Sequence, residues 1–264
     1  MRTEGEDRGR RRSVPAGAPG RMAFGVALVA LAAGCVTTLE EAAREAARGG
    51  IDPAPLIEAL AAQHEAIEAT KRIFDVTLLE GRRRFSGAGA VEYRGDPRRL
   101  DADVFGPHDT HVLSVRLEGD RLTVRLPREG EVLTGEVGDP RFAELTGERA
   151  LVSPEILGAL VGAYDVRELV RGADATAAAT DGNRRTLYVR RGDTLHALTL
   201  QAPEGHLVEY RQARDGRLVY RVRFDDFQPV GGRDSPRHIV LRDFMKERRL
   251  VIDVTREHEE VTGV

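Results

Sequence analysis

The sequence predicts an α+β fold in which a curved antiparallel sheet, a half-barrel of about 10–11 strands, has two or three helices plugging its concave face. Two observations predict it. Beyond residue 76, most of the chain consists of short segments in which apolar and polar residues alternate, joined by polar turns, as in half-buried antiparallel strands. Only two or three segments have helical spacing. They are too few to cover a large flat sheet, so the sheet must curve around them.

The first 34 residues have the pattern of a secretory signal peptide. An apolar stretch over residues 22–33 follows a basic region that contains Arg8, Arg10, Arg11, Arg12 and Arg21. A basic region, a short apolar region and a small-residue end are typical of such peptides, and the stretch is shorter than the roughly 20 residues that cross a bilayer. An alternative start at Met22 would remove the basic region.

Residues 35–52 are predicted to form a tether ahead of one domain that spans residues 53–264. Residues 36–50 favour a helix, since Glu40 and Arg44 are spaced for an ion pair on a helical face, but they have almost no large apolar face. The chain has 40 basic and 43 acidic residues, and its predicted signal peptide is rich in arginine. The rest is therefore acidic, which argues against a nucleic-acid partner.

Two regions are predicted to be helical. The first runs from Ala54 to about Phe74, with Leu56, Leu60, Ile67 and Phe74 on one side, and the sheet is predicted to begin near Val76. The second interrupts the strands. It has a short helix within residues 139–147 and another that starts at Ser153 and Pro154, which suit the N-cap and first positions. The apolar side of that last helix consists of Ile156, Leu157, Leu160 and Val161.

The predicted strands form hairpins whose apolar residues share one face. Residues 118–121 turn the chain between two such strands, and further turns are predicted at residues 191–193 and at Asp215-Gly216, a strong hairpin signal. The strands around the first turn present Leu113, Val115 and Leu117, then Leu122, Val124 and Leu126. The last hairpin joins Ile239 and Leu241 to Leu250, Ile252 and Val254.

The apolar concave face is either a plain core or the wall of a cavity for an apolar ligand, because barrel mouths are common ligand sites. In the cavity interpretation, the candidate ligand-binding residues come from strands and from the interrupting helix. They are Leu113, Val115, Leu122, Val124, Ile156, Leu160, Tyr220, Val222 and Leu250.

The segment Leu31-Ala32-Ala33-Gly34-Cys35 resembles the lipobox of bacterial lipoproteins. The resemblance implies that the Cys35 sulfur is acylated, that the chain is cleaved before it, and that lipid anchors the protein to a membrane. Val36, which is not aspartate, implies sorting to the outer membrane. Cys35 is the only cysteine, so an internal disulfide is excluded. The alternative is a small unpaired residue that ends the signal peptide.

Four stretches resemble the Lol lipoprotein-localisation family of carriers and receptors. They are "FSGAGAVEYRGDPRRLDADVFGP", "VRLEGDRLTVRLPREGEVLTGE", "LVSPEILGALVG" and "SPRHIVLRDFMKERRLVIDV", and the resemblance covers roughly Ala54 to Arg256. It implies a half-barrel that takes up acyl chains of lipoproteins or other lipids at the cell envelope, facing the periplasm. The chain has no tryptophan, which the receptor's cavity often includes. The alternative is a scaffold lipoprotein for envelope assembly, with a filled core.

The sequence contains no signature of catalysis. "HDTH", with His108 and His111, lacks a third ligand nearby for zinc, and no nucleophile elbow, phosphate loop or dinucleotide fingerprint is present. We therefore expect a protein that is not an enzyme, with no cofactor and no metal. A hydrolase built from residues remote in sequence is the least supported alternative.

Phe244 and Met245 lie at a predicted hairpin tip beside Lys246, Arg248 and Arg249. One interpretation is a loop that touches a membrane, with cations near lipid phosphates and the apolar tip in the interface. The alternative is that these side chains fold back onto the helical lid.

Overall fold

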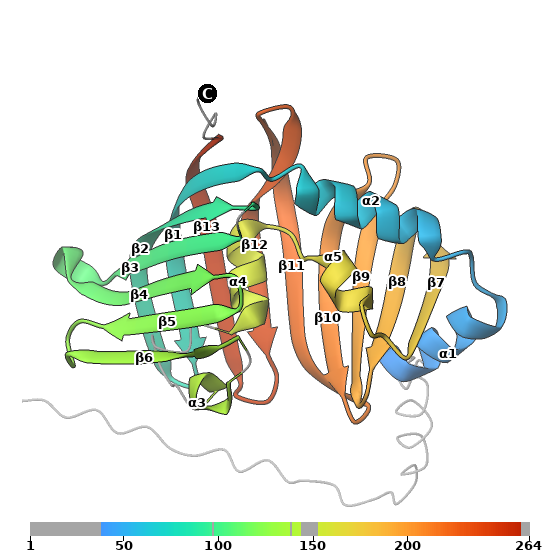
Figure 1. The fold of residues 1–264 in the computed structure, drawn as a ribbon, viewed down its shortest axis with the longest axis horizontal. Helices are drawn as coiled ribbons and strands as arrows, with labels where there is room; N and C mark the ends of the chain where they lie inside the picture. Colours follow the sequence, from blue (N-terminus) through green and yellow to red (C-terminus); the bar gives the residue numbers. More distant parts are fainter. Residues whose placement is uncertain (1–37, 97, 138, 144–152, 260–264) are drawn as a thin grey trace, which may run out of the picture. The chain divides into compact units, whose positions relative to one another are not determined.

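The computed structural model describes residues 38–259 except 97, 138 and 144–152. Its strands form one antiparallel sheet with the order β6-β5-β4-β3-β2-β1-β13-β12-β11-β10-β9-β8-β7. The chain therefore starts in the middle of the sheet, builds out to the β6 edge, crosses to the β7 edge and returns, so that its last strand pairs with its first (Figure 1).

The strands are β1 (Ala69–Glu80), β2 (Arg83–Arg94), β3 (Arg99–Phe105), β4 (His111–Glu118), β5 (Arg121–Leu126), β6 (Glu131–Glu136), β7 (Ala175–Asp181), β8 (Arg184–Arg191), β9 (Thr194–Gln201), β10 (His206–Arg214), β11 (Arg217–Val230), β12 (Arg233–Asp243) and β13 (Arg248–Glu259). The helices are α1 (Leu39–Gly49), α2 (Ala54–Glu65), α3 (Pro140–Ala143), α4 (Pro154–Val161) and α5 (Val166–Val170), with a 3₁₀ turn, η1, at Pro107–Asp109. None of the helices in the described ranges is long and apolar enough to cross a bilayer.

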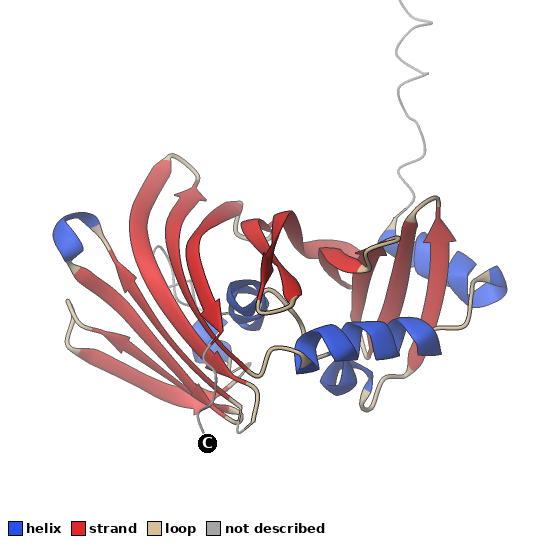
Figure 2. Ribbon diagram, turned by 90° about the horizontal axis from the view of Figure 1, so that it is seen from above, coloured by secondary structure: helices blue, strands red, loops and turns tan. Residues whose placement is uncertain are grey.

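The sheet is curved and unclosed, and short helices lie within its curve (Figure 2), which confirms the predicted α+β half-barrel. It has 13 strands in the described chain, more than the 10–11 predicted. The edge strands have the weakest alternation. β6 reads "EVLTGE" and β7 reads "ATAAATD". Neither has the run of large alternating apolar residues by which a strand is recognised in sequence.

The predicted first helix is too long. α2 ends at Glu65 and β1 begins at Ala69, so Phe74 lies on a strand and Ile67 lies in the connection. Both side chains are buried, which is why they fitted a helical face in the sequence. The segment instead pairs along its length with β2 and β13, and its β-branched residues favour this extended conformation. The sheet thus begins seven residues before the predicted Val76.

The predicted hairpins are confirmed. β4 and β5 pair Leu117 with Leu122 and Val115 with Val124, and all four are buried. β12 and β13 pair Ile239 with Ile252 and Leu241 with Leu250. Between β10 and β11, Asp215 and Gly216 have φ values of 49° and 73°. Two positive φ angles are what a two-residue hairpin turn of this hand requires, and Asp-Gly adopts them readily.

Helix α1 covers the sheet on the side opposite the main core. The helix confirms the helical pattern predicted for residues 36–50, and Thr38 caps it through the Glu41 amide. Ala43 and Ala46 are buried against Tyr188, Leu195 and Ala197 of β8 and β9, and their small size lets the helix approach closely. After the helix, the Ile51 amide donates to the Ala178 carbonyl at 2.9 Å, which occupies part of the β7 edge. The role of this segment as a tether stays a prediction.

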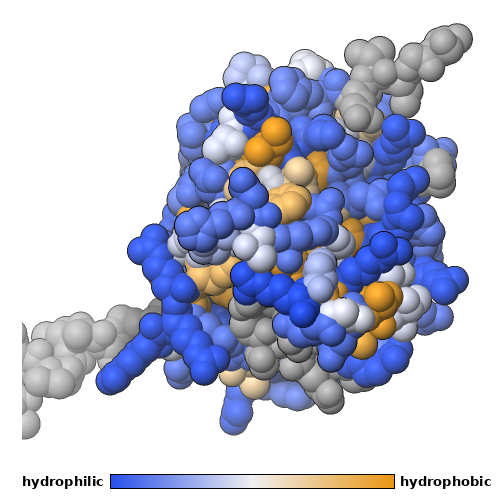
Figure 3. Space-filling model, turned by 90° about the vertical axis from the view of Figure 1, so that its left-hand side faces the viewer, coloured by the Kyte–Doolittle hydropathy of each residue, from blue (hydrophilic) through white to orange (hydrophobic). Residues whose placement is uncertain are grey.

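Large hydrophobic side chains are exposed at few places in the described chain. They are Ile51, Ile73, Val132, Phe244 and Met245. The side of the molecule that lies at the left of Figure 1 is mainly hydrophilic, and its hydrophobic residues form small, separate groups (Figure 3).

A buried ionic network joins the middle of the sheet to α4. The Arg72 side chain on β1 is fully buried, with Nε 3.1 Å from Glu257 Oε1 on β13. Its Nη1 donates to the Leu160 carbonyl of α4 at 2.8 Å, and its Nη2 donates to Ser235 Oγ on β12 at 2.6 Å. Glu257 also accepts from Ser235 at 2.6 Å and from Arg233 at 2.7 Å. Burial opposes the charge of Glu257, but Arg72 and Ser235 keep its pKa below the ordinary value.

Glu257→Gln is expected to lower the free energy of unfolding by about 3–5 kcal/mol, because it leaves the buried Arg72 guanidinium without its carboxylate. Urea unfolding followed by circular dichroism measures the loss. The matched control is Glu92→Gln, which removes the charge from an exposed ion pair with Lys71, also on the sheet. That change is expected to cost less than about 1 kcal/mol. Equal losses in the two variants would contradict the assignment.

Candidate functional site

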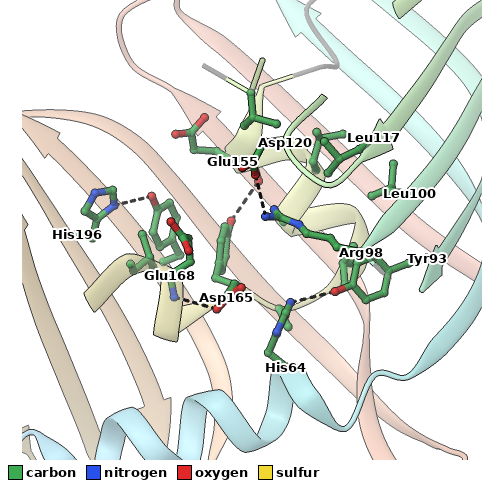
Figure 4. Close-up of a pocket in the computed structure, with 18 of the residues that line it drawn as sticks. His64, Tyr93, Arg98, Leu100, Leu117, Asp120, Glu155, Asp165, Glu168 and His196 are labelled. Carbon is green, nitrogen blue, oxygen red and sulfur yellow. Dashed lines mark hydrogen bonds and ion pairs between the residues drawn. The ribbon is translucent and has the colours of Figure 1, made fainter. Parts of the chain in front are cut away.

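A cavity of about 430 Å³ lies between the α4–α5 segment and the concave face of the sheet (Figure 4). Its apolar wall is formed by Leu100, Leu117, Val137, Leu157, Val161, Ala163 and Leu169. Its polar lining is formed by His64, Tyr93, Arg98, Asp120, Glu136, Glu155, Tyr164, Asp165, Glu168, Arg191, His196 and Tyr210. The lining therefore comes from α2, from both halves of the sheet and from the two short helices.

Caps at both short helices position this wall. Ser153 Oγ accepts from the Ile156 amide at 3.3 Å and starts α4, as predicted from the sequence. α4 ends at Gly162, which has φ +81°, and a side chain there would meet the Arg72 guanidinium at 2.7 Å. Asp165 Oδ1 then accepts from the Glu168 amide at 3.0 Å and starts α5. The sequence analysis missed α5, although an Asp N-cap three residues before a Glu was its signal.

Two tyrosines and a histidine form the inner end of the cavity. The rings of Tyr164 and Tyr210 stack with centroids 4.2 Å apart, and the Tyr164 hydroxyl donates to the Glu155 carbonyl at 3.1 Å. The Tyr210 hydroxyl is hydrogen-bonded to His196 Nδ1 at 2.9 Å. Burial raises the pKa of both tyrosines and lowers the pKa of His196 to about 4. The three side chains are therefore neutral at pH 7, and this end of the cavity carries no charge from them.

Charged groups surround the neutral end. Asp120, Glu136, Glu155, Asp165 and Glu168 line the cavity together with Arg98 and Arg191. Arg98 Nη1 lies 3.9 Å from Asp120 Oδ1. Burial raises the pKa of Glu155. Burial also lowers the pKa of His64, whose Nε2 lies 3.2 Å from the Tyr93 hydroxyl oxygen. An apolar wall with a charged surround suits an amphiphile, whose chain and head group need different environments.

The nine predicted ligand-binding residues are not in the described lining of this cavity. Eight are buried in the main core, and Tyr220 is partly buried against that core. The cavity is instead lined by their neighbours, such as Leu117 on β4 and Leu157 and Val161 on α4, which the sequence had placed on the same apolar faces. Nothing in the sequence indicated that His64, His196 and Tyr210 line a cavity, because a single polar residue within a helix or strand does not predict one. Ligand binding by the nine residues stays a prediction.

The other predicted site residues lie elsewhere. Phe244 and Met245, in the turn between β12 and β13, are exposed to 43% and 64%. They therefore do not fold back onto the helices, and contact with a membrane stays a prediction. Cys35 lies outside the described residues.

The histidines of "HDTH" lie in η1 and at the start of β4. No group of side chains in the described ranges has the composition and spacing to hold a metal ion. His111 Nε2 lies 2.9 Å from Ser114 Oγ and 3.1 Å from Asp103 Oδ1, so one nitrogen contacts both residues. A serine hydrolase needs the acid and the serine on opposite nitrogens of the ring.

No protein-family model matches the chain, and no curated protein matches it. Several solved structures are similar to the chain in fold. A putative outer membrane lipoprotein-sorting protein domain from Vibrio parahaemolyticus aligns with a TM-score of 0.61 at 9% identity, over 81% of this chain and 95% of its own. A LolA superfamily protein from Nitrosomonas europaea aligns with a TM-score of 0.58 at 13% identity, over 81% of this chain and 96% of its own. A DUF1329 family protein from Desulfovibrio piger aligns with a TM-score of 0.58 at 15% identity, over 81% of this chain and 96% of its own.

These similarities establish the fold of the chain, which is LolA-like. It is the fold of domains named for lipoprotein sorting, and the predicted resemblance is confirmed at this level.

The buried His196 gives a pH-dependent stability. Its pKa is about 4 in the folded chain and 6.5 in an exposed histidine, so between these values the unfolded chain binds more protons. The free energy of unfolding is therefore expected to fall, by on the order of 3 kcal/mol, as the pH drops from about 7 to 4. Urea unfolding at several pH values measures this. His196→Gln should flatten the dependence, whereas His258→Gln, at an exposed position, should leave it in place.

Proposed function

We propose that this protein is an outer-membrane lipoprotein that binds the acyl chain of a lipid or lipoprotein in its half-barrel, as a binding protein and not an enzyme. The observation that carries the proposal is the 430 Å³ cavity, whose volume lies in the range of small-molecule sites. The LolA-like fold supports it, because two of the similar structures are named for this superfamily or for lipoprotein sorting.

The walls of the cavity supply the affinity. Each methylene group moved from water to an apolar surface contributes about 0.8 kcal/mol. Leu100, Leu117, Leu157 and Val161 are nearly fully buried, and they present such a surface on facing elements. The neutral Tyr164–Tyr210 stack extends this surface at the inner end. A chain bound there would leave its head group near the charged residues around the cavity.

The short helices supply the entry. α4 is eight residues long and α5 is five, and only the connection Gly162–Asp165 joins them. Elements of this length have few contacts of their own, so they open at a lower free energy than the strands beneath them. Arg72 holds only the C-terminal end of α4, through the Leu160 carbonyl. We therefore place chain entry at α5 and the connection.

A tryptophan in the cavity wall tests the proposal. The chain has no tryptophan, so Leu169→Trp, at a half-buried position of the lining, introduces a unique fluorophore. Residues 37–264 form one compact unit, and this segment is used after circular dichroism has verified its fold. A dibrominated fatty acid or lipopeptide is expected to quench the indole fluorescence, because a chain bound in the cavity brings its bromine atoms into contact with the wall. The quenching should saturate when the site is filled.

Val132→Trp is the matched control, since Val132 lies on the edge strand β6 and is 60% exposed. It should show only weak, non-saturating quenching. Equal behaviour of the two variants would contradict the acyl-binding proposal and would favour the filled-core scaffold.

Acylation of Cys35 is tested separately. Cells that express the full chain and are fed an alkyne-labelled palmitate are expected to label the protein, and Cys35→Ala should abolish the label and release the protein from the membrane pellet. These losses are expected because Cys35 is the only thiol in the chain and the predicted signal peptide is too short to span a bilayer. Retention of the variant in the pellet after an alkaline wash would argue against a lipid anchor.

A further inference from the structure

One end of the sheet presents a fixed apolar tip. Phe244 and Met245 are the exposed hydrophobic residues in the turn between β12 and β13. Asp243 Oδ1 accepts from the amides of Met245 and Lys246, both at 3.0 Å, and the Phe244 amide donates to the Val219 carbonyl of β11 at 2.9 Å. The turn is therefore held by hydrogen bonds while its two large side chains point away from the core.

Arginines surround this tip. Arg242 and Arg249 are exposed and lie opposite each other in the β12–β13 register. Glu80 of β1 pairs in register with Arg248, so the β1–β2 turn, with the exposed Arg82, Arg83 and Arg84, lies beside the same tip. None of Arg82, Arg83, Arg242 and Arg249 forms an ion pair with any residue in the described ranges. Glu247 is an exposed acid in the turn, and the cations outnumber it.

The described chain begins at this end of the sheet. In Figure 1, the β10–β11 and β12–β13 turns and the start of α1 all lie along the lower side. Glu40, in the first turn of α1, forms an ion pair with Arg190 of β8, and its Cγ lies 3.9 Å from the position of a Cβ added to Gly216 in the β10–β11 turn. Thr38 is three residues after Cys35, a chain length of at most about 11 Å. An anchor on Cys35 would thus hold this end near the bilayer.

We propose that this end of the sheet, defined by the β1–β2 and β12–β13 turns, docks onto a bilayer that contains anionic phospholipid. Phe244 and Met245 enter the interface, and Arg82, Arg83, Arg242 and Arg249 lie at the level of the phosphates. The inference rests in part on the proposed anchor at Cys35. One residue of the cavity lining, Arg191, ends β8 next to Arg190, the ion-pair partner of Glu40.

The test uses the full, anchored chain in vesicles. The chain has no tryptophan, so Met245→Trp provides a unique reporter at a site that is 64% exposed. In vesicles of brominated phosphatidylcholine mixed with phosphatidylglycerol, its indole is expected to lose about half of its emission and to shift to the blue, because interfacial side chains lie within the headgroup–acyl boundary. Val132→Trp, equally exposed but on β6, should keep most of its emission.

Charge reversal of Arg82 and Arg249 to Glu in the Met245→Trp chain should reduce the quenching severalfold, as should vesicles without phosphatidylglycerol. Equal quenching of the Met245→Trp and Val132→Trp chains, or stronger quenching of the latter, would overturn the proposal. Mass spectrometry of the purified chain reports the acyl group on Cys35 independently of docking. Saturable quenching of Leu169→Trp by a soluble brominated fatty acid reports the cavity, so failure of docking is distinguishable from failure of ligand binding.

Discussion

The arrangement depends on one buried charge, the guanidinium of Arg72. It lies where the first strand meets the last, and it bonds to β12, β13 and α4 at once. A charge in this position must be matched by a carboxylate, because an uncompensated ion in an apolar interior is very costly. Glu257 supplies it and is in turn held by Ser235 and Arg233. The network therefore fixes both the central strand pairing and the position of the helix that bounds the cavity.

The cavity follows from the same geometry. A curved sheet leaves a space on its concave side that side chains fill where the strands converge and leave open where they diverge. Around Arg72, α4 fills the space and the apolar residues form a continuous core. Beside this core, the α4–α5 segment spans both halves of the sheet, and the space between them is the cavity. The half-barrel therefore contains both a filled apolar core and a cavity beside it.

The sequence was sufficient for the fold class but not for the exact limits of this space. Alternation identified β4, β5, β12 and β13 with their registers, because one-sided burial leaves a period of two. It failed between Ile67 and Phe74, where buried positions of a connection and a strand coincide with helical spacing. It also failed at α5 and β7, which are short or built from small residues. Which apolar residues face the cavity depends on how α4 and α5 sit over the sheet, a tertiary contact that no local pattern records.

The pairing of β1 with β13 limits when the middle of the sheet can form during synthesis and folding. Thr70 and Glu257, which share a hydrogen bond, are 187 residues apart. The central ladder cannot form until the chain has been synthesised through β13, and contacts this distant slow folding. Until then Arg72 has no carboxylate to offset its charge, so compact partial structures are disfavoured. In this topology the middle of the sheet is therefore completed by the last strand, after the hairpins on either side of it are available.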